Sequence, residues 1–144
     1  MKNIVFLILI VILLYAFSDN KGKEMICSNK APMPIGPYSQ AIRSGGMLYV
    51  SGQIALTNDG GLDSSSIENE TKQVLNNIKA ILEAANLKMQ NINKVSIFTT
   101  NLKHFAQINA VYQSYFKSPY PARETIQVSA LPKGAHIEIS VMAD

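Results

Sequence analysis

Residues 120–142 read YPARETIQVSALPKGAHIEISVM, and they contain two runs in which apolar and polar side chains alternate. A break with the sequence LPKG, at residues 131–134, separates the two runs. One face of the first run carries Ile126, Val128 and Ala130, and one face of the second carries Ile137, Ile139 and Val141. An alternation of period two is typical of half-buried strands, so this stretch predicts two strands of a sheet.

Each of these runs also carries a charge, because Arg123 begins the first and Glu138 lies within the second. Charged residues on strands are either solvated or functional. In the ordinary interpretation, Arg123 lies at the surface or pairs with Glu124, and the Glu138 side chain is solvated. If residues 131–135 form a simple hairpin loop, Glu138 pairs near Val128, roughly 17 Å along the strand from Arg123. A site that uses both charges therefore needs a different strand arrangement or a second subunit.

The rest of the chain predicts two helices and three further strands. The helices cover residues 67–85, where Ser65 and Glu68 have capping-box spacing, and 103–116; the strands cover 40–43, 47–54 and 94–100. The expected order is ββ-α-β-α-ββ. A mixed β-sheet with two helices packed on one face belongs to the α+β class.

The N-terminus has a different composition from the rest of the 144 residues. Lys2 precedes an apolar run at residues 4–17, and the small residues Ala16 and Ser18 stand at positions −3 and −1 of a possible cleavage after Ser18. These are features of a signal peptide, and the run is shorter than the roughly 20 residues of a membrane span. We expect a signal-like segment at 1–18, a linker at 19–24 and one domain at 25–144. If this segment is cleaved, we expect the domain on the secretory route or, by way of it, in a plastid-type organelle, without stable membrane association. If translation starts at Met25, we expect a cytoplasmic protein.

Charge and residue usage exclude several classes of function. The chain has 13 Lys and Arg against 10 Asp and Glu, and its basic residues are scattered singly, so no nucleic-acid partner is expected. The single cysteine, Cys27, allows no intrachain disulfide framework. His104 and His136 lack the spacing of metal ligands, so no metal site is predicted. No phosphate-binding loop or serine-hydrolase elbow occurs.

A small set of polar groups on constrained backbone remains as candidates for chemistry. They are Tyr38, Ser51, Gly52, Asn109, Arg123, Thr125 and Glu138. A strand-borne arginine presents a fixed fork that suits a carboxylate, and a buried glutamate with a raised pKa can activate water or carry a proton. A glycine beside the ligand lets backbone N–H groups approach a developing negative charge. This set suits the hydrolysis of a small acid.

From Met25 to the C-terminus the chain resembles the RidA (YjgF) family of reactive-intermediate deaminases. The resemblance rests on IGPYSQA at 35–41, YVSGQI at 49–54, INAVY at 108–112 and YPARETIQVSALPKGAHIEI at 120–139. Several separate motifs in the right order make it specific. It implies a chorismate-mutase-like α+β fold and a homotrimer with a site in each cleft between subunits, where residues from two chains can converge.

The resemblance also implies an activity and roles for the candidates. The activity is hydrolysis of enamines and imines such as 2-aminoacrylate and 2-iminobutyrate, products of pyridoxal-phosphate-dependent dehydratases, to 2-oxo acids and ammonia, without a cofactor. Arg123 would bind the substrate carboxylate and Glu138 would activate water, while Tyr38, Ser51, Gly52 and Asn109 would line the pocket. Thr125 stands where many members have cysteine, which argues against thiol chemistry there and leaves the substrate preference open.

Two other classes of function stay open at this point. Some eukaryotic members of the family are associated with RNA cleavage or inhibition of translation, although the near-neutral charge of this chain disfavours phosphate binding. A chaperone-like or purely binding role is the other alternative, and it predicts an activity that does not depend on Arg123.

Overall fold

The computed structural model describes residues 22–144; the predicted signal-like segment and residues 19–21 of the predicted linker lie outside the described residues. In chain order the elements are β1 (Glu24–Ile26), β2 (Ala41–Ser44), β3 (Met47–Gln53), α2 (Ile67–Ala84), η1 (Met89–Asn91), β4 (Ile92–Thr99), η2 (Leu102–His104), α3 (Phe105–Tyr115), β5 (Ala122–Gln127), η3 (Pro132–Gly134) and β6 (Ile137–Ala143). The predicted order ββ-α-β-α-ββ is confirmed from β2 onward. The short strand β1, which begins at Glu24, precedes it.

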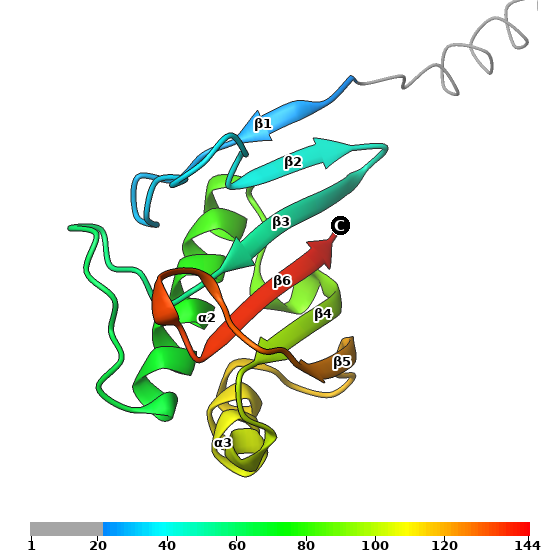
Figure 1. Cartoon of the computed structure of the whole chain (residues 1–144). Coiled ribbons are helices and arrows are strands. Elements are labelled where there is room, and N and C mark those ends of the chain that lie inside the picture. Colours follow the sequence, from blue (N-terminus) through cyan, green and yellow to red (C-terminus); the bar gives the residue numbers. More distant parts are fainter. Residues whose placement is uncertain (1–21) are drawn as a thin grey trace, which may run out of the picture.

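The six strands form one mixed sheet in the order β1-β2-β3-β6-β4-β5 (Figure 1). The pair of β4 and β5 is parallel, with α3 as the connection between them, and all other neighbours are antiparallel. Strand β6 lies between β3 and β4, so β5 and β6 do not form the simple hairpin considered from the sequence. The short helix η3 instead leads the chain from the edge of the sheet back to its centre.

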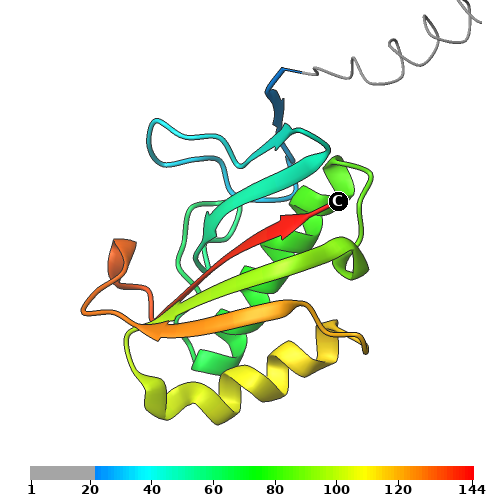
Figure 2. The same cartoon turned by 90° about the vertical axis from the view of Figure 1, so that its right-hand side faces the viewer.

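Both helices pack on one face of the sheet, as predicted; Figure 2 shows α2 behind the sheet and α3 along β5. The buried face of β6 consists of Ile137, Ile139, Val141 and Ala143, which pack in one core with the apolar stripe of α2. Helix α2 begins after Ser66, whose hydroxyl accepts the backbone N–H of Asn69 at 3.2 Å. The capping residue is therefore Ser66 and not Ser65.

Strand β5 differs from the prediction in position and in orientation. It ends at Gln127, so Ala130 lies outside it, and Ile126 is 45% exposed. Parallel pairing places Arg123 opposite Val95 and Thr125 opposite Ile97, and both of these β4 residues are fully buried on the helix side. The alternation assigned Ile126 to the buried face, which is wrong because β5 is an edge strand whose inner face lies against α3.

The sheet face opposite the helices is not covered by any described residue of this chain. It carries apolar side chains that are more than two-fifths exposed, among them Tyr49, Ile126 and Met142. Lys94 forms an ion pair with Glu124 on the same face at 2.6 Å. A sheet face of this composition is typical of an interface.

None of the helices within residues 22–144 is long and apolar enough to cross a bilayer.

Candidate active site

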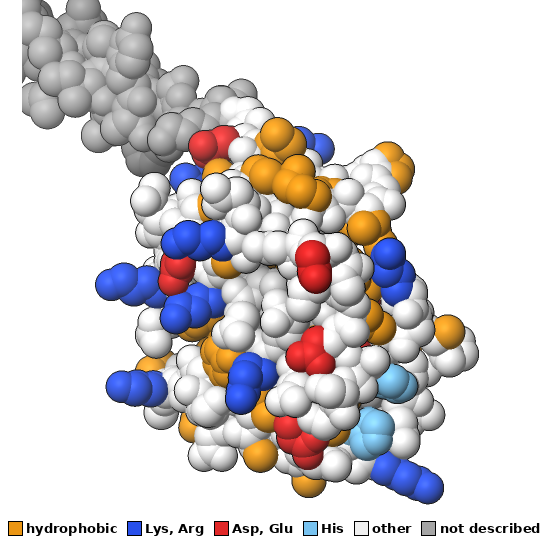
Figure 3. Space-filling view, turned by 90° about the vertical axis from the view of Figure 1, so that its left-hand side faces the viewer, with side chains coloured by type: hydrophobic (Ala, Val, Ile, Leu, Met, Phe, Trp, Pro, Cys, Tyr) orange, Lys and Arg blue, Asp and Glu red, His pale blue; other side chains and the backbone are white. Residues whose placement is uncertain are grey.

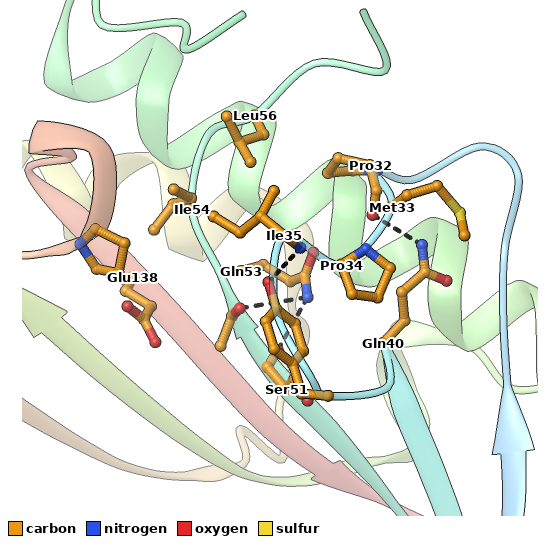
Figure 4. A pocket seen from close by; sticks show the side chains of 13 residues that line it. Pro32, Met33, Pro34, Ile35, Gln40, Ser51, Gln53, Ile54, Leu56 and Glu138 are labelled. Atoms are coloured by element: carbon orange, nitrogen blue, oxygen red, sulfur yellow. Dashed lines mark hydrogen bonds between the residues drawn. The ribbon is translucent and has the colours of Figure 1, made fainter. Parts of the chain in front are cut away.

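The first cavity lies at one end of β3 and β6 and has a volume of about 270 Å³ (Figure 4). A proline-rich loop, residues 32–38, forms one wall, β3 forms the floor and β6 forms the opposite wall. Four of the predicted site residues line it: Tyr38, Ser51, Gly52 and Glu138. We call this cavity, with these four residues, the carboxylate half-site.

The proline-rich loop is held in place by one buried side chain, Gln40, which is 2% exposed. Its amide nitrogen donates to the carbonyl oxygens of Ser28, Ala31 and Pro32 at 3.1, 3.2 and 2.9 Å. Its amide oxygen accepts the backbone N–H of Ser28 at 2.6 Å. Because these four bonds satisfy the whole amide, Gln40 fixes the loop that carries Tyr38. Sequence reasoning missed Gln40 as a site residue, although it lies within the IGPYSQA motif.

Two of the predicted residues at this cavity already make bonds within the chain. The Ser51 hydroxyl donates to the carbonyl oxygen of Ser39 at 2.7 Å, so it ties β3 to the loop. The Tyr38 hydroxyl accepts the backbone N–H of Ile35 at 3.2 Å, which leaves its own proton available to a ligand. Tyr38 is therefore a candidate donor, whereas Ser51 shapes the pocket.

Glu138 extends from β6 over Gly52, and the two residues fit closely. A Cβ built on Gly52 would overlap with the Oε1 atom of Glu138. The register of β3 against β6 shifts between Val50 and Gln53, so the ladder is irregular at this glycine. Glu138 is half-buried, and burial raises the pKa of its carboxyl group above the ordinary value. A carboxylate in this position can exchange protons with water closer to neutral pH.

The second cavity lies against α3 and β5 and has a volume of about 330 Å³. It brings together two predicted residues, Asn109 and Arg123. The guanidinium carbon of Arg123 lies 4.6 Å from the centre of the Tyr112 ring and 6.0 Å from that of Phe105. These distances allow cation–π attraction, so the aromatic rings hold the guanidinium group on the helix side of β5. We call this cavity the guanidinium half-site.

Tyr112 also lines this half-site, although it was not among the residues predicted from the sequence. It is 5% exposed and stacks on Phe116 with ring centres 4.3 Å apart. Burial raises the pKa of its phenol to about 12, against the opposing charge of Arg123, and no described residue bonds to the hydroxyl. The sequence signal was its position three residues after Asn109, on the same face of a helix.

Thr125 lies two residues beyond Arg123 on the same face of β5. It is half-buried opposite Ile97, and it lines neither of the two cavities. In one copy of the chain, the structure therefore groups Tyr38, Ser51 and Gly52 with Glu138, groups Asn109 with Arg123, and leaves Thr125 beside the second group.

The two half-sites are separate within one chain. Glu138 is opposite Phe98 and Phe98 is opposite Ile126, so Glu138 and Arg123 are two strands apart and offset by three residues. This register puts their Cα atoms about 14 Å apart. Their side chains also project from opposite faces of the sheet, because Arg123 faces α3 and Glu138 faces away from the helices. A single chain does not bring both groups to one small ligand.

The sequence of residues 28–144 matches the family described as Endoribonuclease L-PSP. The chain belongs to this family, which is the RidA (YjgF) family. Among residues 22–144 no three His, Cys, Asp or Glu side chains are grouped as a metal site would require.

Relatives in the RidA family cover most of this chain. A RutC family protein of Pyrococcus horikoshii is 45% identical over 122 residues, which cover 84% of this chain and 97% of the relative. The human 2-iminobutanoate/2-iminopropanoate deaminase is 42% identical over 122 residues, covering 84% and 89%. The crystal structure of YyfA, a Rid family protein of Yersinia pestis, is 49% identical with a TM-score of 0.82 and coverage of 85% and 98%. The implied chorismate-mutase-like fold is confirmed by this likeness.

Proposed function

We propose that this protein hydrolyses reactive 2-imino acids and their enamine tautomers, such as 2-iminobutyrate and 2-aminoacrylate, to 2-oxo acids and ammonia. The observation that carries the proposal is the pair of complementary half-sites, one with a half-buried carboxylate and the other with a guanidinium group on an aromatic support. The human relative with a deaminase name adds support, although other relatives carry only the RutC family name.

We further propose that each site forms between two copies of the chain, in a homotrimer. The carboxylate half-site of one copy would lie against the guanidinium half-site of the next. The contact is heterologous, since it joins two different surfaces, and a heterologous contact closes into a ring of three when it rotates each copy by a third of a turn. The uncovered sheet face, with Tyr49, Ile126 and Met142 exposed, supplies apolar area for such an interface.

In the proposed reaction, Arg123 binds the substrate carboxylate through two parallel hydrogen bonds and thereby places C2 beside Glu138 of the neighbouring copy. Water adds to C2 of the protonated imine, and the Glu138 carboxylate accepts one of its protons, giving a carbinolamine. Glu138 then returns the proton to the nitrogen. Ammonia leaves as the C2 hydroxyl becomes the 2-oxo group, and the carboxylate takes up the hydroxyl proton before releasing it to water.

The other residues at the two half-sites orient the substrate. The Tyr38 hydroxyl and the Asn109 amide can donate hydrogen bonds to the substrate or to the attacking water. Gly52 leaves the space in which the Glu138 carboxylate stands. Thr125 takes no part in these chemical steps, because a threonine hydroxyl is a poor nucleophile without an adjacent base. No cofactor is needed, since each step is an addition, an elimination or a proton transfer.

The test is a coupled assay in which a threonine dehydratase generates the imine and the release of 2-oxobutyrate is followed. The protein should accelerate that release, and Arg123→Ala should abolish the acceleration. Arg123→Lys is the matched control, because it keeps the charge and removes the bidentate fork, and it should retain partial activity. Release that is not accelerated by the wild-type protein, or is accelerated equally by Arg123→Ala, would contradict the proposal.

RNA cleavage is a second candidate, because the family description names an endoribonuclease. A groove with several lysines lies along α2, where Lys72, Lys79 and Lys88 line a cavity of about 790 Å³ together with Glu83. On the face shown in Figure 3, however, acidic side chains lie among and beside the basic ones. Binding that weakens as the salt concentration rises would support this candidate, and no binding at low salt would exclude it.

We also propose that residues 1–18 direct the protein to the secretory route and are then removed. This proposal rests on the composition of the segment, with Lys2 before an apolar run. Mass spectrometry of the native N-terminus distinguishes a start at Met1, Asp19 or Met25, and a start at Met25 would instead place the protein in the cytoplasm.

A further inference from the structure

A buried carboxylate lies outside both half-sites, on the fourth residue of α2. Glu70 is 1% exposed, and among residues 22–144 it is the one charged residue that is buried. Its Oε1 atom accepts the backbone N–H of His136 at 2.6 Å, and its Oε2 atom lies 3.0 Å from Nδ1 of the same residue. Burial of a carboxylate is unfavourable unless hydrogen bonds replace those that it made with water. The two contacts with His136 therefore stabilise the buried carboxylate of Glu70.

The peptide groups of His136 are fixed on both sides. Its carbonyl oxygen accepts the hydroxyl of Thr99 and the backbone N–H of Thr100, each at 3.0 Å. Its N–H is held by Glu70, as described above. The position of the backbone at His136 is therefore determined by α2 on one side and by the end of β4 on the other.

This residue lies where the irregular chain becomes β6. The preceding segment contains two left-handed residues, Lys133 with φ of 56° and Gly134 with φ of 74°, and the ladder between β4 and β6 reaches only to Ile137. The contacts of His136 are thus the last ones before the strand begins. Glu138 follows two residues later, so the direction of the chain at His136 sets where the Glu138 carboxylate points.

We infer that Glu70 is a positioning residue for Glu138, acting through the backbone of His136 to hold the Glu138 carboxylate over Gly52. The expected effect of Glu70 on catalysis rests on the proposed function. The effect of Glu70 on the position of the Glu138 carboxylate can be tested without that function. The His136 imidazole is half-exposed and adds a contact to the carboxylate, whereas the bond to the backbone N–H transmits the position.

The decisive variants are Glu70→Met and Glu70→Gln, which have nearly the same length and similar helix propensity. Glutamine keeps an oxygen that accepts the His136 N–H, whereas methionine leaves this N–H without a partner. Glu70→Met should lower kcat by about tenfold to a hundredfold with KM within about threefold, because a small displacement of a catalytic group has effects of that size. Glu70→Gln should stay within about threefold of wild type in both constants.

The variant His136→Ala distinguishes the role of the imidazole ring from the role of the backbone N–H. It keeps the N–H bond to Glu70 and removes the contact at Nδ1, so kcat should remain within about threefold of wild type even if the protein becomes less stable. A loss of kcat in His136→Ala as large as that in Glu70→Met would overturn the route through the backbone.

A second measurement does not use activity. The Glu138 carboxyl carbon can be titrated by ¹³C NMR, with Glu138→Gln to assign its signal. In Glu70→Met the titration midpoint should move from the wild-type value toward that of a solvated glutamate, and in Glu70→Gln it should not move. If the wild-type protein has no deaminase activity, the proposed function fails and this titration alone decides the inference. An unchanged midpoint in Glu70→Met would refute it.

Discussion

The carboxylate of Glu138 occupies the space that a side chain on Gly52 would fill. The two residues come from neighbouring strands, β6 and β3, at the bulge where their register shifts. A residue of any other type at position 52 would therefore compete with the carboxylate. This relationship explains why a glycine lies inside a strand, where it otherwise weakens the strand.

Gly52→Ala should lower kcat by about a hundredfold, because the new methyl group pushes the Glu138 carboxylate out of its position. The atoms that must move belong to the carboxyl group at the end of a flexible side chain, and the backbone at Gly52 does not need a positive φ. The free energy of unfolding should thus change by less than about 1 kcal/mol. Steady-state kinetics and chemical denaturation measure the two effects. In a Glu138→Gln background the same substitution should have little further effect on kcat.

The raised pKa of Glu138 predicts how activity depends on pH. Only the ionised carboxylate can accept a proton from water, so kcat/KM should rise as the pH increases through the pKa of Glu138 in the free enzyme. Burial raises this pKa, so the midpoint should lie above the value of about 4.3 for a free glutamate. A pH–rate profile whose acidic limb lies at or below that value would argue against Glu138 as the base.

The same shift predicts an effect on stability. The folded protein holds the Glu138 proton more tightly than the unfolded chain, so the free energy of unfolding decreases as the pH rises from the unfolded pKa to the folded one. Glu138→Gln should therefore be more stable than wild type at neutral pH, and the difference should disappear in acid below the unfolded pKa. Urea denaturation at several pH values measures this difference, and equal stability at neutral pH would contradict the prediction.

The aromatic support of Arg123 predicts different outcomes for two substitutions of Tyr112. Tyr112→Phe keeps the ring and removes a buried hydroxyl without a described partner, so affinity and stability should stay close to wild type. Tyr112→Leu removes the cation–π contact, and KM should rise by about threefold to thirtyfold with kcat less affected. Both variants are compared by steady-state kinetics. A Tyr112→Leu protein that is merely less stable, with unchanged KM, would show a role in packing alone.

Much of the fold could be predicted from local patterns. The alternation in residues 137–141 and the apolar stripe of α2 both follow from which side of an element is buried, and that information lies within each segment. The position of β6 between β3 and β4 could not be predicted in this way, because strand order depends on contacts between distant segments. The predicted orientation of β5, with Ile126 on the buried face, was wrong for the same reason.

The candidate site shows a similar division. Arg123 and Glu138 stood out as charged residues on predicted strands. The resemblance of the chain to the RidA family then suggested a role for each of them. Gln40 and Glu70 did not stand out, because a polar residue at the end of a predicted strand or in the first turn of a helix is normally exposed. Their burial arises only when the loop and the helix pack against other parts of the chain. In the proposed homotrimer, Arg123 and Glu138 come together only between two copies, and the sequence of one copy does not describe that contact.

Mixing two inactive variants tests the proposed shared site. Glu138→Ala removes the carboxylate half-site and Arg123→Ala removes the guanidinium half-site. If each site combines Glu138 of one copy with Arg123 of the next, a mixed ring contains some intact sites, namely those where an Arg123→Ala copy supplies Glu138 and a Glu138→Ala copy supplies Arg123. After unfolding and refolding together in equal amounts, the mixture should regain about a quarter of wild-type activity.

The controls for this experiment are each variant refolded alone, which should stay inactive, and the double variant mixed with wild type. The double variant supplies neither group, so it should dilute the wild-type activity and restore none. The mixture of single variants recovers activity only when the two groups come from different chains. If it stays inactive while the oligomer assembles normally, Arg123 and Glu138 act within one chain, and the register that separates them by two strands would have to change on assembly.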